Sequence, residues 1–425
     1  STRTTTRDIR RHNRSILLSR VFFDGPLSRL ELGQLSGLSS ATVSTVMAEL
    51  ICDGLIVEAG QVDSGGGRPR VLLRVNPGYG YFVGVDVGEI GVTVELFDLA
   101  MQRVGGVTRP VASHRPPAET AVAEIVAGIG EVLATPANAD VERRGAAPVL
   151  IDPSAIVGVG VGVPGIVTER PTPVVTAPTI GWDAVPLADM LAAHGVAAPV
   201  FVGNGANTQA QAEMWFGAAR GAQHAVVALV GSGVGAAVIA DGTPFGGTTG
   251  GAGEWGHTTL VYGGRQCRCG ARGCLEAYVG AEAVLDRYAA LDGAPALGAD
   301  HEDEMAAIAA LVDAARSAGG PGSGLGRGAA ADLVSETADL LGASIGNLIN
   351  LFNPERVVLG GWAGLALASV AMDRICVAAE RQALAQPYAQ VTIVPSEIGL
   401  DAVALGAATL PLAKLLRRGE DPRPR

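Results

Sequence analysis

The N-terminal segment spaces its apolar residues with the period of an α-helix. Between Arg11 and Phe23 the apolar side chains fall on one helical face. Gly25 and Pro26 interrupt this pattern, because proline has no backbone donor and its ring clashes with the preceding turn. The pattern therefore predicts a first helix that ends before the glycine.

Start signals for two further helices follow. Residues 28–31 have the spacing of a capping box, which predicts a short helix to Ser36. Gly37 suits the tight turn between two helices, and Ser39 can cap a third helix from residue 40 to about residue 52. This third helix has an apolar face that should pack inward. Its outward face is rich in small hydroxyl groups and carries Ser40, Thr42, Ser44, Thr45 and Glu49.

A predicted hairpin comes next. Residues 55–59 and 71–75 are typical of strands and flank a loop rich in glycine and arginine, residues 60–70. Two helices, a turn and a hairpin in this order predict a winged helix-turn-helix DNA-binding domain over residues 1–78. Its third helix should enter a major groove and its loop arginines a minor groove. The candidate DNA contacts are Ser39, Ser40, Thr42, Ser44, Thr45, Arg68 and Arg70.

Beyond residue 78 the pattern changes to buried strands separated by glycine-containing turns. Residues 81–87 and 92–98 form one strand–turn–strand unit, and residues 225–230 and 236–239 form another. An internal duplication of this type predicts an α/β protein with two lobes. Glycine loops at such places can present backbone amides to phosphate groups.

Composition and charge narrow the class of protein. Of 425 residues, 48% are hydrophobic and 17% are charged, which excludes a disordered chain. Residues 1–80 hold ten arginines and seven acidic residues, so the total charge of −11 divides into about +3 there and −14 beyond. A basic head on an acidic body indicates that only the head meets a polyanion.

The segment that most resembles a membrane span, Ala225–Ala240, is 16 residues long, and a bilayer needs about 20. Residues 1–7 have no apolar core behind them that resembles a signal peptide. We therefore expect a cytoplasmic protein without membrane contact.

The cysteines predict a metal site. Three lie within eight residues, and a histidine precedes them with the spacing H-x9-C-x-C-x4-C. Three thiolates and one imidazole form a closed tetrahedral site, the usual arrangement of structural Zn²⁺, with no open position for catalysis. Cys52 and Cys376 sit among apolar residues and are expected in the core. The four predicted ligands are His257, Cys267, Cys269 and Cys274.

The region around these ligands resembles the signature of the ROK family, which contains repressors, open reading frames and kinases. The resemblance covers nearly the whole chain and includes the motifs Gly253–His257, Cys267–Glu276, Val163–Gly165, Ala177–Trp182, Asn204–Asn207, Asn353–Gly361 and Gly406–Ala408. It implies an actin-like ATPase fold of the sugar kinase/Hsp70 type. The small lobe would be residues 79–202. The large lobe would be residues 203–425, with the zinc loop and a last helix that returns to the small lobe.

The N-terminal head resembles the repressor branch, which includes xylose and N-acetylglucosamine repressors. Sugar kinases of the family read Asn-Asp-Ala-Asn, and that aspartate is the general base. This chain has Gly205 there, and glycine cannot accept a proton. Glu89, in the first phosphate loop, would also place a negative charge near ATP phosphates. The resemblance therefore implies no catalytic residue and no enzyme activity.

By the same resemblance, four residues match sugar-contacting positions: Asn204, Glu254, His257 and Glu276. Gly205 and Thr179 replace two further sugar contacts, so the ligand could be a different sugar, a phosphosugar or none. We expect a homodimeric or homotetrameric repressor of carbohydrate genes on a palindromic double-stranded DNA operator. Its phosphate contacts would come from head arginines that include Arg10, Arg11 and Arg14. The alternatives are a sugar kinase with a DNA-binding head and a DNA-binding protein that ignores sugars.

Overall fold

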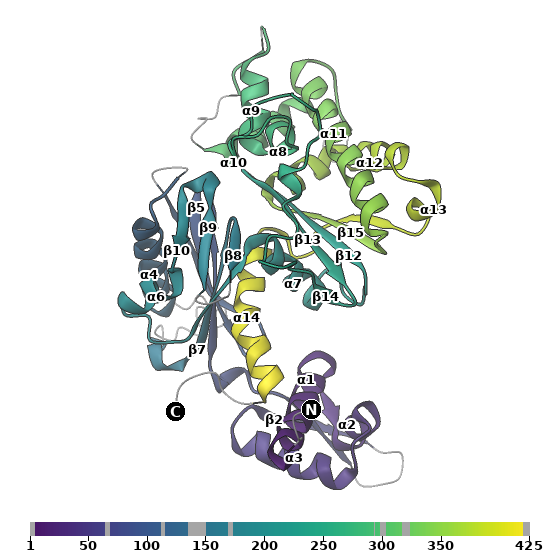
Figure 1. Ribbon diagram of the computed structural model, residues 1–425. Helices are drawn as coiled ribbons and strands as arrows, with labels where there is room; N and C mark the ends of the chain where they lie inside the picture. The colour runs from purple at the N-terminus through teal and green to yellow at the C-terminus, as the bar shows by residue number, and fades with distance from the viewer. Residues whose placement is uncertain are drawn as a thin grey trace.

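The computed structural model describes residues 5–63, 69–111, 115–134, 150–168, 173–292, 294–297, 303–316 and 324–419. A head, a small lobe and a large lobe follow one another along the long axis of the molecule (Figure 1). The head contains α1 (Thr6–Asp24), β1 (Leu27–Ser28), α2 (Arg29–Ser36), α3 (Ser40–Cys52), β2 (Ile56–Val62) and β3 (Arg70–Val75).

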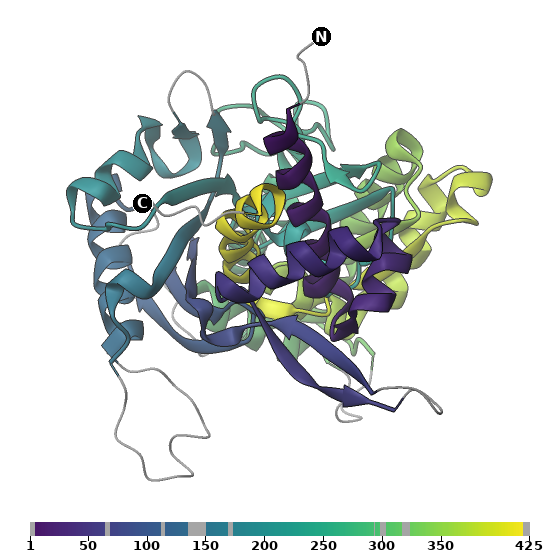
Figure 2. The same ribbon diagram turned by 90° about the horizontal axis from the view of Figure 1, so that it is seen from below.

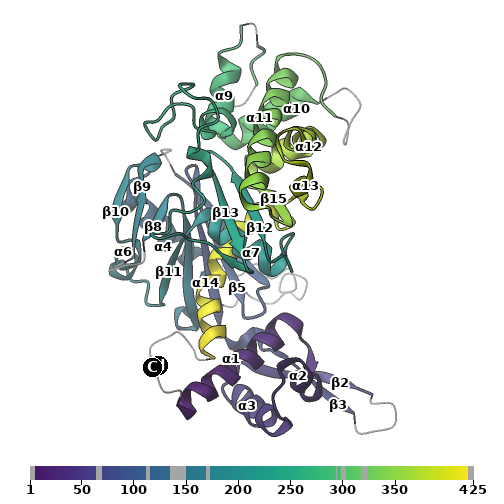
Figure 3. The same cartoon turned by 45° about the vertical axis from the view of Figure 1, so that its right-hand side comes forward.

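Local signals fix the helices of the head where the sequence predicts them. Ser28 Oγ accepts a hydrogen bond from the Glu31 amide, and the Ser28 amide donates to Glu31 Oε2 at 2.8 Å, so the capping box is formed. Gly37 ends α2 in the left-handed conformation, with φ 69°. Ser39 caps α3. The three strands pair in the order β1-β3-β2, and the β2–β3 hairpin projects sideways from the head (Figure 3).

The two lobes repeat one sheet. In the small lobe β4, β5 and β6 are antiparallel, and β7 and β11 join them in parallel on the other side, giving the order β11-β7-β4-β5-β6. In the large lobe β12 to β16 pair in the same way, in the order β14-β13-β12-β15-β16. The expected duplication is therefore present. The strands are β4 (Tyr81–Val87), β5 (Gly91–Asp98), β6 (Arg103–Pro110), β7 (Ile156–Val163), β11 (Val200–Asn204), β12 (Ala225–Val230), β13 (Val234–Ala240), β14 (Thr243–Pro244), β15 (Arg356–Gly360) and β16 (Thr392–Pro395).

The remaining elements cover these sheets. The small lobe adds a short antiparallel sheet, β10-β9-β8. Its elements are β8 (Ile166–Thr168), β9 (Val174–Ala177), β10 (Trp182–Val185), α4 (Ala118–Ala134) and α6 (Leu187–Ala193). Helix α7 (Gly205–Phe216) follows β11 directly. The large lobe adds α8 (Glu276–Val279), α9 (Ala281–Ala289), α10 (Glu304–Ala315), α11 (Ala329–Phe352), α12 (Trp362–Gln382) and α13 (Ala385–Tyr388).

The last helix, α14 (Ala402–Arg418), returns to the small lobe and packs on β4, β7 and α7. Glycines on both sides permit the close approach. A Cβ added to Gly160 would lie 1.8 Å from the Ala407 carbonyl oxygen, and one added to Gly406 would lie 1.7 Å from that of Thr208. By length and composition α12 and the helical stretch Gly399–Arg418, which contains α14, are apolar enough to cross a membrane. In the fold α12 packs along α11 and α14 against the small lobe.

The head and the small lobe share one hydrophobic core. Apolar residues of α1 and α3 belong to the same buried cluster as Phe82 and Phe97 of the small-lobe sheet and Leu412 and Leu415 of α14. Seen from below, α1 lies across the end of α14 (Figure 2). The core therefore does not end at residue 78, where the sequence places the boundary between the two domains.

Two contacts extend this shared core at its edges. Phe23 at the end of α1 stacks edge-on with Trp215 at the end of α7, with ring centroids 5.0 Å apart. Arg14 Nε donates to the Gly419 carbonyl oxygen at 3.0 Å, directly after α14. The middle and the C-terminal end of α1 are thus attached to the body.

Candidate metal and ligand site

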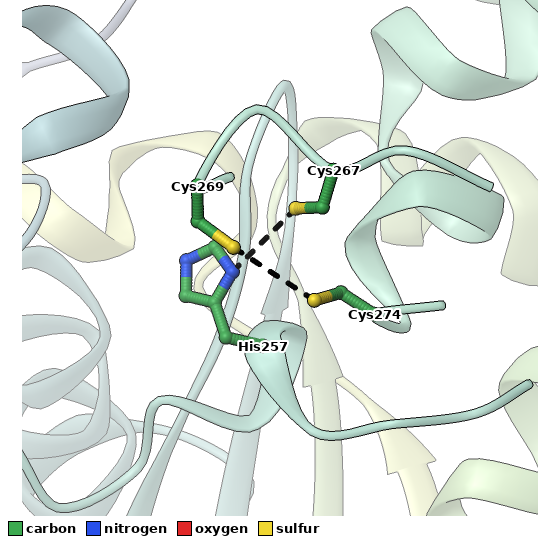
Figure 4. A group of neighbouring side chains, drawn as sticks. All are labelled: His257, Cys267, Cys269 and Cys274. Carbon is green, nitrogen blue, oxygen red and sulfur yellow. Dashed lines mark hydrogen bonds between the residues drawn. The ribbon is translucent and has the colours of Figure 1, made fainter. Parts of the chain in front are cut away.

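The four predicted metal ligands come together at one point of the large lobe (Figure 4). Their donor atoms all lie within 4.8 Å of one another. The Sγ atoms of Cys269 and Cys274 are 3.8 Å apart, as are Cys267 Sγ and His257 Nδ1. Two thiolates bound to one tetrahedral metal at about 2.3 Å would be about 3.8 Å apart. The donor set and its spacing therefore fit a single metal ion.

The backbone brings these donors together through tight glycine turns. His257 ends the short helix Trp255–His257, and the cysteines lie on the loop that follows. Gly273 has φ 86°, and a Cβ there would lie 1.7 Å from the Val261 carbonyl oxygen, so only glycine fits. Thr259 and Cys274 form an antiparallel bridge that closes the loop.

Burial raises the pKa of the Cys267 thiol to about 12, and burial also raises the pKa of Cys274. Both thiols are therefore neutral at pH 7 in the metal-free chain. A divalent cation would reverse this preference, because it stabilises thiolates directly. Outside the cluster, Cys52 is exposed and Cys376 is half-buried. The expectation that Cys52 is a core residue is wrong, because the last residue of α3 lies on its outward face.

Three of the four candidate sugar contacts surround the metal cluster. His257 directs Nδ1 toward Cys267, and its Nε2 lies 3.9 Å from Glu254 Oε2. One ring nitrogen can therefore bind a metal while the other points toward a ligand. Burial and the nearby Glu276 carboxylate raise the pKa of Glu254. Glu276 is itself buried at the start of α8, and its Oε2 accepts from the Val234 amide at 3.0 Å.

Asn204 occupies a different position. It ends β11 and caps α7, where its Oδ1 accepts from the Asn207 amide at 3.1 Å. Its Nδ2 donates to the Gly165 carbonyl oxygen at 2.7 Å. The side chain is thus bonded to backbone of the small lobe and of α7 rather than to the metal-binding loop.

Arg268 is a residue of this site that the sequence analysis missed. It lies between two of the metal-ligand cysteines, and its side chain is only 14% exposed. Its Nη1 and Nη2 both donate to the Glu89 carboxylate, the latter at 2.8 Å to Oε1. Its Nε donates to Glu276 Oε1 at 3.1 Å. A buried glutamate needs a cationic partner, but no local pattern in the sequence marks Glu89 as buried or Arg268 as its partner.

Glu89 reaches this arginine from the other lobe. It follows β4 of the small lobe, whereas Arg268 belongs to the large lobe. A Cβ on Gly233, in the second glycine loop, would lie 3.2 Å from Arg268 Nη2 and 3.4 Å from Glu89 Oε1. Burial raises the pKa of Glu89 although Arg268 opposes the shift. The ion pair therefore fills the space beside the two glycine loops.

The space around Gly205 does not require a glycine. It is the first residue of α7, and the nearest atoms to an added Cβ are the Val163 carbonyl oxygen at 3.6 Å and Val403 Cγ1 at 3.9 Å. These are ordinary contact distances. The backbone at this position would therefore accept a side chain.

In the head, most of the candidate DNA contacts are on the surface. The exposed ones are Ser39, Ser40, Ser44, Thr45 and Arg70. Thr42 is half-buried and its amide donates to Ser39 Oγ at 3.2 Å. Arg68 lies outside the described residues.

Two of the three arginines expected to meet phosphate are tied to α3. Arg14 is 12% exposed and pairs with Glu49 and Asp53 at 3.2 and 2.6 Å. Arg14 is thus paired within the protein, and its contact with phosphate stays a prediction. Arg10 pairs with Glu49 at 2.7 Å but remains 65% exposed. Arg11 is half-buried.

The chain is similar to known proteins in sequence and in structure. A sequence model described as the ROK family matches residues 82–414. The chain belongs to the ROK family. The xylose repressor of Caldicellulosiruptor bescii is 29% identical over 95% of this chain and 96% of its own length.

Two further ROK relatives extend this comparison. The N-acetylglucosamine repressor of Escherichia coli O6:H1 is 26% identical over 79% of this chain and 77% of its own. A solved ROK transcriptional regulator, described as a homologue of the E. coli MLC protein, has a TM-score of 0.74. It is 26% identical and covers 97% of both chains. The predicted family and its actin-like sugar kinase fold are therefore confirmed.

Proposed function

We propose that the chain is a DNA-binding transcription regulator, a repressor of carbohydrate genes whose operator affinity is modulated by a sugar or phosphosugar. The observation that carries this proposal is the head. It lies outside the matched family region, which begins at residue 82, and its shared core fixes it to the ROK body. Relatives that match nearly the whole chain, head included, are named repressors.

In this proposal the head is a winged helix-turn-helix. Helix α3 enters the major groove with its exposed hydroxyl face, and the β2–β3 hairpin reaches the minor groove. Two heads read the halves of a palindromic operator, which requires a homodimer or homotetramer in the cytoplasm. The DNA contacts are Ser39, Ser40, Thr42, Ser44, Thr45, Arg68 and Arg70.

The effector binds beside the metal centre. Glu254, His257 and Glu276 bond sugar hydroxyls, since each carboxylate can accept two hydrogen bonds, and Asn204 approaches from the small lobe. Zn²⁺ on His257 and the three cysteines is structural and keeps the loop folded around these carboxylates. The chain is not a kinase, because Gly205 offers no general base and Glu89 occupies the space beside the glycine loops.

Helix α7 links the ligand site to the head. Asn204 caps its start, and Trp215 in its last turn stacks on Phe23 of α1. A sugar that prefers one arrangement of the lobes changes the position of α7 relative to the sheet and thereby the spacing of the heads. It shifts operator affinity only by the difference between its affinities for the two states.

The deciding experiment measures operator binding with and without sugars. DNA from the protein's own upstream region is titrated at a stated salt concentration with a panel of sugars and phosphosugars. Loss or gain of binding with one compound supports the proposal and names the effector. Tight binding that no compound changes would leave a DNA-binding protein without a sugar ligand. ADP release with any sugar would instead favour the kinase.

A further inference from the structure

The candidate sugar site is strongly acidic. Glu276 is 6% exposed and Glu89 is 8% exposed, and both touch Arg268. Glu304 is buried as well, and its Oε2 accepts from Ser232 Oγ in the second glycine loop. Glu254 lies near enough to Glu276 for the two charges to interact. A ligand that bonds to Glu276 and Glu254 therefore enters a region of several carboxylates.

The buried cation of this region already faces three carboxylates. Arg268 gives Nη1 and Nη2 to Glu89 and Nε to Glu276, and Glu282 adds a further carboxylate 3.6 Å from Nη1. The Val234 amide, a backbone donor of the glycine loop, is also taken by Glu276. Arg268 and Glu276 line a small cavity of about 130 Å³, and Arg265, an exposed residue, also lines it.

These carboxylates determine which ligands can bind. A sugar hydroxyl gains from carboxylate acceptors, because hydrogen bonds to charged groups are strong. A phosphate ester carries nearly two negative charges at pH 7 and would have to break the Glu89–Arg268 pair or remain close to these carboxylates. Like charges that are juxtaposed in a partly buried site oppose binding.

We infer that the site selects an uncharged sugar and excludes its phosphate ester, and that Glu89 enforces the exclusion by keeping Arg268 occupied. The inference rests on the proposed function and narrows its ligand class. Glu89 is then a specificity residue that acts through Arg268.

The test compares matched pairs of compounds on the full-length, zinc-loaded protein. Glucose and glucose 6-phosphate, and N-acetylglucosamine and its 6-phosphate, are titrated by calorimetry and by their effect on the operator complex. Xylose is included as a further neutral sugar. The neutral member of the pair that binds is expected to bind at least about tenfold more tightly.

Two variants locate the source of the discrimination. Glu89→Gln removes the negative charge and one of the two acceptors that face the guanidinium, and it is expected to reduce the preference for the neutral sugar by about tenfold. Glu282→Gln is the matched control, because it removes a carboxylate from the same guanidinium but one that is 56% exposed. It should leave the preference within about twofold. Zinc content and melting temperature verify that both variants fold.

The possible outcomes distinguish a failure of this inference from a failure of the proposed function. Tighter binding of the phosphate ester overturns this inference and leaves the proposed function standing. An unchanged preference in Glu89→Gln also overturns it, because the exclusion then does not depend on Glu89. If no compound binds or changes the operator complex, both the inference and the sugar-responsive function fail.

Discussion

Glu95 of β5 is a carboxylate buried among apolar residues. It pairs across the sheet with Gly84, on the face of β5 that α14 covers, and its side chain is fully buried. Burial raises its pKa to about 7, Asp401 adds to the shift, and Arg103 at 2.7 Å opposes it. The unfolded chain ionises this group near pH 4.5. The folded protein therefore binds more protons between these two values, and its stability falls as pH rises through that window.

Glu95→Gln should therefore stabilise the protein at pH 8 and change little at pH 4.5. We expect about 1 to 3 kcal/mol at pH 8, less than the full pKa shift because the Arg103 pair is lost. Urea unfolding at the two pH values measures this. Glu124→Gln, which removes a partly exposed pair with Arg109, is the control and should stay within about 0.5 kcal/mol. Destabilisation at pH 8 would mean that the Arg103 pair outweighs burial.

Cys269→Ser tests the metal centre. Loss of one of four ligands should lower zinc content and also the response to sugar, since the loop positions Glu254, His257 and Glu276. Zinc analysis and operator titrations measure the two effects. Cys52→Ser changes an exposed cysteine outside the cluster and should alter neither. A full sugar response in the zinc-free protein would disconnect the metal from the ligand site.

The sequence predicts contacts between residues where the partners are close to one another along the chain. The spacing of one histidine and three cysteines is local, so the sequence alone indicates the cluster. Arg268 and Glu89 are 179 positions apart and Arg14 and Gly419 are 405 apart. No local pattern reports such pairs, which is why the role of Arg268 was not predicted.

At the scale of elements, the proposed link between the ligand site and the head runs through α7, and it can be tested directly. Trp215→Ala removes the contacts of this ring with Phe22 and Phe23 of α1 but changes neither a candidate ligand residue nor α3. We expect operator affinity and sugar affinity to persist, while the sugar-induced change in operator affinity falls by about 1 kcal/mol or more. Leu351→Ala, at an exposed position on α11, is the control. An undiminished sugar response in Trp215→Ala would exclude this route.

Helix starts in the head were predictable because their signals are short. The capping box at Ser28 and the turn at Gly37 act within four residues. The strands of the hairpin extend beyond the predicted limits, to Ile56–Val62 and Arg70–Val75, because pairing between β2 and β3 extends both strands. The return of α14 to the small lobe was expected from the family resemblance alone, and its glycine contacts with β7 and α7 are long-range.

At the scale of the whole molecule, the chain has a sugar kinase fold with a glycine, Gly205, at the start of α7. Gly205→Asp is expected to fold, since the site has room for a side chain. It should release no ADP with any sugar above the wild-type level, because Glu89 and Arg268 still occupy the space beside the glycine loops. A coupled ADP assay measures this. Sugar-dependent ADP release would show that the missing base alone separates this chain from the kinases.

The duplicated architecture was predictable from sequence, since strand–glycine–strand units recur in it. The hydrophobic core that the head shares with the body was not predictable from sequence. Phe82, Phe97 and Leu412 look like residues of the body, and only the structure brings them against α1 and α3.

That shared core sets a limit on modularity. A chimaera cut at residue 78 would separate Leu17 and Leu18 from Leu412 and Leu415 and leave both fragments with apolar surface in water. An exchange of DNA specificity between relatives must therefore transplant the surface of α3 and the hairpin while keeping the inner face of α1. The residues that join the head to the body must therefore stay together when parts of this protein are exchanged.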